Sequence, residues 1–203
     1  MGSRIMHYCI SSIIADKIKI NDQSEFLLGG IAPDIHGLMG VRKGVTHFKD
    51  IDEAGESYIN YVRFYETYKH AMNEPFYLGY LCHLISEDVW LDFYLKKNGE
   101  ISSDQNNKIL QTTYRDFRRL NGRMIELYSL QLHSHTIPSV KIEGYNANYL
   151  VKLLELLHED FTIDHDLMNE PLELYSNDEI IDYIDKSVEK SIDFVAPLTA
   201  VNP

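Results

Sequence analysis

Apolar residues recur every three to four positions along most of the chain, the spacing that places them on one face of an α-helix. The first such run covers 3–20. A turn ending at Asp22 follows, and its side chain is a suitable N-cap for a second helix over 24–32. Pro33 cannot continue that helix and favours extended geometry for the residue before it. We therefore expect Asp34 at a sharp exit from a buried segment.

The longest apolar run covers 76–94, with Pro75 suited to the first turn of a helix and Gly99 to its end. This run carries His83 and Glu87 four residues apart, which places both side chains on one face of the helix, one turn apart. A polar stripe on an otherwise apolar helix needs partners, because an unpaired buried charge is costly. The partner is either another side chain or a metal ion.

The same periodicity predicts four more helices. They are expected over 52–71, 103–127, 146–161 and 176–195. Ser102 or Ser103 suits the N-cap of the second of these, and Ser176 with Glu179 has the spacing of a capping box before the last.

Glycine, proline and histidine interrupt the helical pattern over 36–44 and over 130–145, so both segments are expected to be irregular. No stretch alternates like a strand, and no internal repeat is present. The sequence therefore predicts an all-α fold, a single domain over 1–203 with six or seven helices.

Composition narrows the class of protein. The formal net charge is −12 and the isoelectric point is near 5.1, which argues against a scaffold that grips nucleic-acid backbone and against an anionic membrane surface. Cys9 and Cys82 both lie in apolar patterns typical of reduced core thiols. Neither a leader peptide nor a run of about 18 apolar residues is present. We therefore expect a cytoplasmic protein without stable membrane insertion.

Five residues are candidates for metal ligands, and each has an ordinary alternative. His83 and Glu87 present a nitrogen and an oxygen from adjacent turns, as zinc sites do, or form a core hydrogen bond. Asp34 is a ligand or a helix cap. His47 and His7 are unremarkable alone, and the case for a metal comes from taking the five together. Asp88 lies about 100° around the helix from Glu87 and is expected to face elsewhere.

The order of these residues matches a known pattern. A histidine in the first helix is followed by Gly-Gly-Ile-Ala-Pro-Asp34, by Thr-His47-Phe and by Gly-Tyr-Leu-Cys-His83-Leu-Ile-Ser-Glu87. Over residues 1–95 this resembles the zinc-dependent phospholipase C family, whose superfamily includes the single-strand-specific zinc nucleases. The resemblance implies an all-helical fold with a cluster of up to three zinc ions. It also implies that a metal-activated water attacks the phosphorus of a phosphodiester.

The resemblance assigns roles to the five residues. Asp34, His47, His83 and Glu87 would hold one ion, and Glu87 would bridge to a second ion that also takes His7. Asp34 would act as ligand or base, so Asp34 and Glu87 are the expected catalytic residues. By the same resemblance, a third site would need a histidine a few residues beyond the His83–Glu87 pair, where the chain has Phe93 and Tyr94, and a His-x-x-x-Glu on a later helix, which is absent. We therefore expect two ions rather than three, with zinc preferred and manganese or iron able to replace it.

Substrate contacts are expected from His36 and from Arg115 and Arg118, although a solvated histidine and a salt-bridged helix face are the ordinary alternatives. The sequence thus predicts a metal-dependent hydrolase of a small phosphoester or a phospholipid head group. The alternative is a catalytically altered member of the family that serves as a metal-containing binding module. A nucleotide phosphohydrolase of the histidine–aspartate type is disfavoured, because its adjacent pair occurs only at His165-Asp166, in an acidic segment.

Overall fold

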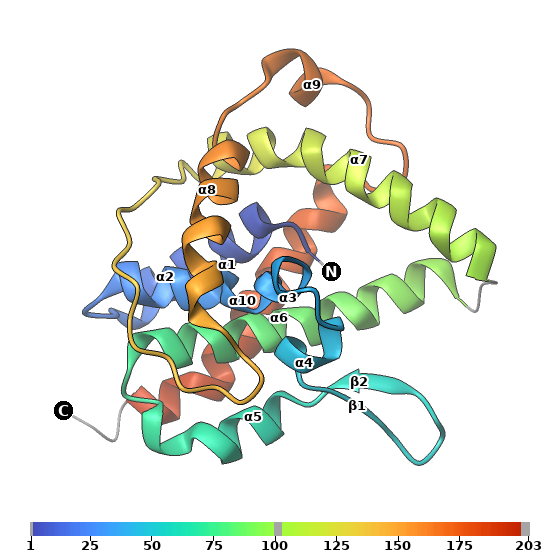
Figure 1. Ribbon diagram of the computed structural model, residues 1–203. Helices are drawn as coiled ribbons and strands as arrows, with labels where there is room; N and C mark the ends of the chain where they lie inside the picture. Colours follow the sequence, from blue (N-terminus) through green and yellow to red (C-terminus); the bar gives the residue numbers. More distant parts are fainter. Residues whose placement is uncertain (1, 100–102, 200–203) are drawn as a thin grey trace.

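The helix α6 (Pro75–Asn98) runs through the centre of the molecule in a computed structural model that describes residues 2–99 and 103–199 (Figure 1). Every residue from Phe76 to Glu87 is buried. This explains why its sequence is apolar on all sides, since a helix covered all round has no solvent face. The predicted ends at Pro75 and Gly99 are confirmed.

The helix α6 packs against α1 (Arg4–Ile18), α2 (Gln23–Ile31), α10 (Asn177–Thr199) and α5 (Tyr61–Tyr68). The Ser3 hydroxyl caps α1 by accepting the N–H of Met6, and the Asp22 carboxylate caps α2 by accepting the N–H of Glu25. Cys9 is buried and free, as the sequence predicted, and so is Cys82. The mainly helical class predicted from the sequence is confirmed.

Glycines let α2 and α6 pack backbone against backbone. A Cβ atom on Gly79 would lie 2.1 Å from the carbonyl oxygen of Phe26, and one on Gly29 would lie 2.1 Å from that of Phe76. Only glycine permits so close an approach. The contact matters for the site, because it holds the carbonyl of Gly30 beside α6.

The chain does not leave α2 sharply at Pro33. It continues through the 3₁₀ helix η1 (Ala32–Ile35) into α3 (His36–Met39) and then α4 (Lys43–His47). Ala32 has helical angles, φ −57° and ψ −36°, so the expected extended geometry is wrong. Pro33 begins a new helix, whose first turn needs no N–H from it. The segment 36–44 is correspondingly less irregular than predicted.

A small hairpin replaces the start of the helix predicted over 52–71. Strands β1 (Lys49–Ile51) and β2 (Ser57–Ile59) pair antiparallel, with Asp50 opposite Tyr58. The Asp52 carboxylate accepts the N–H groups of Ala54 and Glu56, which closes the turn. The helix α5 (Tyr61–Tyr68) begins only after the Asn60 cap and leads into η2 (Lys69–Ala71).

The second half of the chain covers the first. In Figure 1, α7 (Ser103–Leu127) crosses the upper part of the molecule, and the start of α1 lies between α6 and α7. The chain then forms η3 (Ala147–Tyr149), α8 (Leu150–Asp160), α9 (His165–Asn169) and finally α10. Ser102, an expected cap for α7, lies outside the described residues. The capping box of Ser176 and Glu179 is confirmed, although α10 extends past the predicted end at 195.

The described residues contain ten α-helices rather than six or seven. The additional ones are α3, α4 and α9, which have five residues or fewer and are too short to show periodicity. None of the helices within the described ranges combines the length and the hydrophobicity that crossing a bilayer requires.

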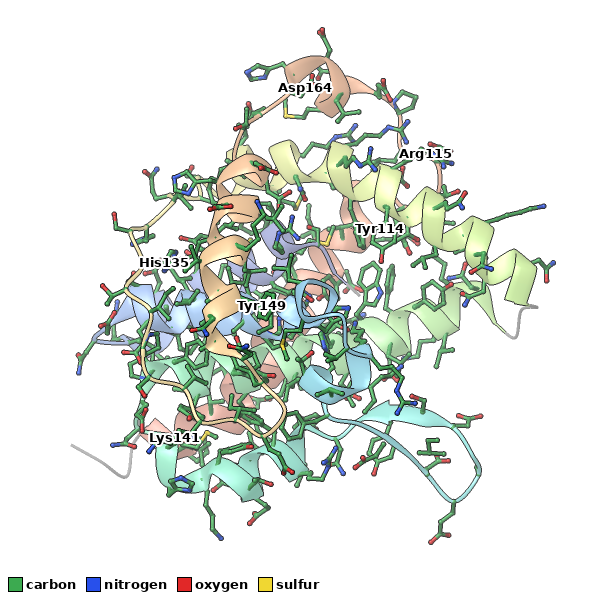
Figure 2. All side chains as sticks on the ribbon, viewed as in Figure 1. Tyr114, Arg115, His135, Lys141, Tyr149 and Asp164 are labelled. Atoms are coloured by element: carbon green, nitrogen blue, oxygen red, sulfur yellow. The ribbon has the colours of Figure 1, made fainter. Side chains whose placement is uncertain are left out.

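The segment 130–145 is irregular as predicted and lies along the surface, where Figure 2 labels His135 and Lys141 on it. Tyrosine hydroxyls hold it. The Tyr77 hydroxyl accepts the N–H of Lys141, the Tyr68 hydroxyl accepts the N–H of Glu143, and the Tyr8 hydroxyl donates to the carbonyl of Gln131. The segment is therefore a fixed strap rather than a lid.

Candidate metal centre

Four separate elements bring the five predicted ligands together. His7 comes from α1, Asp34 from η1 and His47 from α4, while His83 and Glu87 come from α6. The three histidines and Glu87 are at most 2 % exposed, and the Asp34 side chain is 8 % exposed. Residues spread over 80 positions of sequence thus form one buried polar cluster inside an apolar core.

The first group of donors is Asp34, His36 and His47, whose ligand atoms all lie within 4.8 Å of one another. Nε2 of His47 is 3.5 Å from Oδ1 of Asp34 and 3.2 Å from Nε2 of His83. Nε2 of His83 is 4.0 Å from the same Asp34 oxygen. Three donor atoms from three elements therefore converge on one point.

The second group is His7, His83 and Glu87, whose ligand atoms also lie within 4.8 Å of one another. Nε2 of His7 is 3.2 Å from Oε1 of Glu87, and the rings of His7 and His83 stack with centroids 4.0 Å apart. His83 therefore lies between the two groups. Glu87 faces the cluster, whereas Asp88 forms an ion pair with Lys190.

Hydrogen bonds fix which nitrogen each ring presents to the cluster. Nδ1 of His83 donates to the carbonyl of Gly30 at 2.8 Å, so Nε2 of the neutral ring keeps its lone pair. The Thr46 hydroxyl donates to the carbonyl of Lys43 and accepts from Nδ1 of His47, which leaves Nε2 of His47 in the same state. Two lone pairs then face each other across 3.2 Å. A cation between them would be bound by both nitrogens; without one, the other tautomer of His47 lets its Nε2–H donate to Nε2 of His83.

The environment of His47 and His83 shifts their pKa values toward the neutral form that binds a metal ion. Burial lowers the pKa of His47 to about 4. The charge of Lys43 also lowers this pKa, whereas Asp34 and Glu87 raise it. Burial and the neighbouring His7 lower the pKa of His83 well below its ordinary value. Both rings are therefore neutral at pH 7, which a metal ligand must be.

The two carboxylates have the opposite state. Burial raises the pKa of Asp34, but the neighbouring His47, His83 and His7 outweigh it and hold the pKa below its usual range. Burial also raises the pKa of Glu87, and nearby positive charge, that of Lys43 included, together with the His7 hydrogen bond, lowers it well below normal. Neutral imidazoles beside carboxylate anions are the donor set that zinc prefers.

Unsatisfied atoms support the fit to a cation. Oδ1 of Asp34 and Nδ1 of His36 are buried and have no hydrogen-bond partner. An unpaired buried polar atom costs about 1–3 kcal/mol, and more if it is charged. A divalent ion bound between Asp34, His47 and His83 would satisfy the Asp34 oxygen and the Nε2 atoms of both histidines together.

A cleft of about 330 Å³ connects the first group to solvent. Asp34 and His36 lie on one side of it, and residues of α7 and of the α1 start lie on the other. The full lining is Gly2, Ser3, Arg4, Asp34, His36, Tyr114, Phe117, Arg118, Asn121 and Asp160. The centre is thus accessible to a small molecule.

The two candidate substrate arginines lie in different places. Arg118 lines the cleft and has no ion pair within the described part of the chain. Arg115 pairs with Glu173 at 2.6 Å and does not line the cleft. In Figure 2 the labels of Tyr114 and Arg115 lie on opposite sides of α7. Arg115 thus belongs to a salt-bridged face, the ordinary alternative weighed above.

Sequence reasoning missed two features of the centre. His36 joins Asp34 and His47 as a potential ligand, where only a substrate contact was expected. Nothing in the sequence signalled this role, because residues two apart in a helix do not face each other and the grouping depends on the turn from η1 into α3. Lys43 forms an ion pair with Oε2 of Glu87, and no pattern in the sequence indicated it.

Comparisons of the chain with family models, with curated proteins and with solved structures gave no match.

Proposed function

We propose that this protein is a metal-dependent hydrolase of phosphoesters, with zinc as the preferred ion, related to the zinc-dependent phospholipase C family that its motifs resemble. The observation that carries the proposal is the buried convergence of three donors, Nε2 of His47, Nε2 of His83 and Oδ1 of Asp34, with no hydrogen-bond partner for the carboxylate oxygen. Core polar groups are normally paired with one another. A set left unpaired supports a bound ion.

Asp34, His47 and His83 would hold the ion, with His36 in reach of the same group. A divalent ion bound there supplies Lewis acidity toward a phosphoryl group and toward water. The chain's own residues supply the remainder. The Asp34 carboxylate lies where the buried donors meet the cleft, so it can accept a proton from water entering there.

Positive charge in the cleft supports an anionic substrate. The Arg118 guanidinium has no ion-pair partner within the described residues and faces the same cleft as Asp34. Arg4 also lines this cleft and pairs with Asp160 at 2.7 Å. A guanidinium offers paired N–H donors that match the oxygens of a phosphoester. We therefore assign Arg118 to holding the substrate, while burial of the histidines keeps bulk water from the donors.

The first test is metal content followed by hydrolysis. Untagged protein is analysed for zinc, manganese and iron, and then assayed on bis(p-nitrophenyl) phosphate and on p-nitrophenyl phosphate. We expect bound metal in the wild type, and Asp34→Asn and His83→Ala to lose both the metal and at least about 100-fold of the activity. His165→Ala, which changes an exposed histidine far from the centre, is the matched control.

Two results would count against the proposal in different ways. Protein that contains no metal and gains none after incubation with zinc would rule out the metal centre. Protein that retains its metal but hydrolyses neither a diester nor a monoester with any of the three ions would instead favour the binding module. Activity of Arg118→Ala then separates substrate binding from metal binding, because we expect KM to rise while metal content stays unchanged.

A further inference from the structure

The two donor groups differ in how well the protein already satisfies them. Both oxygens of Glu87 are engaged: Oε1 accepts the N–H of Gly2 at 3.2 Å and lies 3.2 Å from Nε2 of His7, and Oε2 accepts from Lys43. Oδ1 of Asp34 has no hydrogen-bond partner. The first group therefore lacks a cation, and the second group already has one in the ammonium of Lys43.

The position of Lys43 follows from α4. Lys43 and His47 are four residues apart on this helix, so they share a face. The same turn of helix thus delivers an imidazole to Asp34 and an ammonium to Glu87. The Lys43 side chain is 24 % exposed and lines a hollow of about 180 Å³ on the other side of Glu87. Its charged end points inward, although solvent is available to it.

His83 can serve one ion. Its Nδ1 donates to the carbonyl of Gly30, so the ring has a single lone pair, on Nε2. If that lone pair goes to the ion at Asp34 and His47, the second group keeps only His7 and Glu87 as ligands. A zinc site normally has at least three protein ligands. With His83 bound to that ion, the second group is incomplete as well as neutralised by Lys43. An ion held by Asp34, His36 and His47 would instead leave His83 to the second group. The Lys43 ammonium beside Glu87 is then what limits the count.

We propose that the Lys43 ammonium takes the cation position beside Glu87, so that the centre holds one metal ion, at Asp34, His47 and His83, instead of two. This inference rests on the proposed function and changes the expected metal count from the sequence. A second divalent ion beside this ammonium would leave a buried site with a large excess of positive charge. Lys43 is thus a positioning residue that fixes the Glu87 carboxylate and limits the centre to one ion.

The test is the number of ions bound, measured without reference to activity. Metal-free wild type is titrated with zinc by calorimetry, and the loaded protein is analysed by mass spectrometry for metal per chain. We expect about one zinc per chain in the wild type and in Lys43→Arg, which keeps the charge, and about two in Lys43→Met, which removes it. Lys49→Met is the matched control, because Lys49 lines the same hollow but forms no bond with Glu87 in the described part of the chain.

The outcomes separate this inference from the proposed function. Two ions in the wild type would overturn the role of Lys43 and leave the metal-dependent hydrolase standing, as would a count of one in folded Lys43→Met. No ion in the wild type would overturn both. If Lys43→Met fails to fold by circular dichroism, the wild-type count and that of Lys43→Arg still decide, since either protein binding two ions contradicts the inference. The double variant Lys43→Met with His7→Ala should return to one ion.

Discussion

At the scale of single residues, the centre depends on hydrogen bonds that orient its rings. The Gly30 carbonyl holds Nδ1 of His83, and the Thr46 hydroxyl holds Nδ1 of His47. His7 has the same kind of partner, since its Nδ1 is 3.0 Å from the Ser86 hydroxyl. Each bond turns Nε2 of its ring into the cluster, so these partners determine the geometry as much as the ligands do.

Thr46→Val tests this orientation without touching a ligand. The change removes the acceptor for Nδ1 of His47 while keeping the shape of the side chain. We expect zinc affinity to fall about 10- to 100-fold, the usual effect of losing a partner that orients a ligand. Competition with a chromophoric chelator measures the affinity.

The control for Thr46→Val is Thr67→Val. Thr67 donates its hydroxyl to the carbonyl of Arg63 on an exposed face of α5, so the substitution removes a similar bond outside the centre. We expect its zinc affinity to equal that of the wild type. Equal affinity in Thr46→Val as well would show that the ring of His47 is positioned by packing alone.

Sequence reasoning selected five residues that the fold brings together, but it did not show how they group. His7, Asp34, His47, His83 and Glu87 could be predicted because their spacing and neighbours matched a pattern. The grouping of these side chains depends on distances between helices, and so does the position of Lys43 among them. Those distances are set by α3 and α4, which are too short for periodicity to reveal.

At the scale of helices and strands, the site is positioned by the close crossing of α2 on α6. The glycines at the crossing let the two backbones touch, and the carbonyl of Gly30 consequently reaches His83. A larger residue at either helix would move that carbonyl away from the ring. The same contact between α2 and α6 thus packs the two helices and orients the ring of His83.

Gly79→Ala should therefore weaken both stability and metal binding. The new Cβ would lie 2.1 Å from the carbonyl oxygen of Phe26, so the helices must separate. Alanine gains about 1 kcal/mol of helix propensity, but forced overpacking costs about 1–3 kcal/mol, and we expect a net loss of up to about 2 kcal/mol in the free energy of unfolding. Urea denaturation of the metal-free protein measures it.

Gly37→Ala is the matched control for this substitution. Gly37 also lies in a helix, yet a Cβ there would meet nothing within 4 Å, so stability should be unchanged or slightly higher. If Gly79→Ala proves as stable as Gly37→Ala, the close crossing of α2 and α6 does not exist in solution.

The shortest helices and strands could not be predicted from the pattern of apolar residues. The long helices and their caps could be predicted, because periodicity and capping residues agree over many positions. The hairpin could not, because strands of three residues show no alternation and the turn depends on the Asp52 carboxylate bonding to backbone N–H groups. The helix expected to begin at Asp52 is displaced for the same reason.

At the scale of the whole molecule, the first half of the chain supplies the donors and the second half supplies the opposite wall of the cleft. The helix α7 is held in place by Asp116, which is fully buried and accepts the backbone N–H groups of Glu173, Leu174 and Tyr175. Arg119 joins Asp116 to Glu173 on the surface. This network fixes α7, and with it Arg118, relative to the chain segment before α10.

The network predicts how stability depends on pH. Hydrogen bonds from Arg115 and Arg119 lower the pKa of Glu173 to about 2 in the folded protein, whereas an unfolded glutamate titrates near its ordinary value of 4.5. A lowered carboxylate pKa contributes stability above the unfolded value and loses it as pH falls through the folded value. Glu173→Gln should therefore have a lower urea midpoint than the wild type at pH 7. The gap should narrow progressively as pH falls from about 4.5 toward about 2, because the unfolded glutamate is protonated first and the folded one last.

Parallel urea titrations from pH 7 to pH 3 measure this gap, with Glu155→Gln as the control. Glu155 also forms an exposed ion pair, with Lys152 three residues before it, but that pair lies within α8 and joins no separate segments. We expect its urea midpoint to stay close to that of the wild type, because such surface pairs contribute little. A gap for Glu173→Gln that is constant with pH would show that the glutamine disturbs packing, and that the charge of Glu173 does not hold α7 to the rest of the molecule.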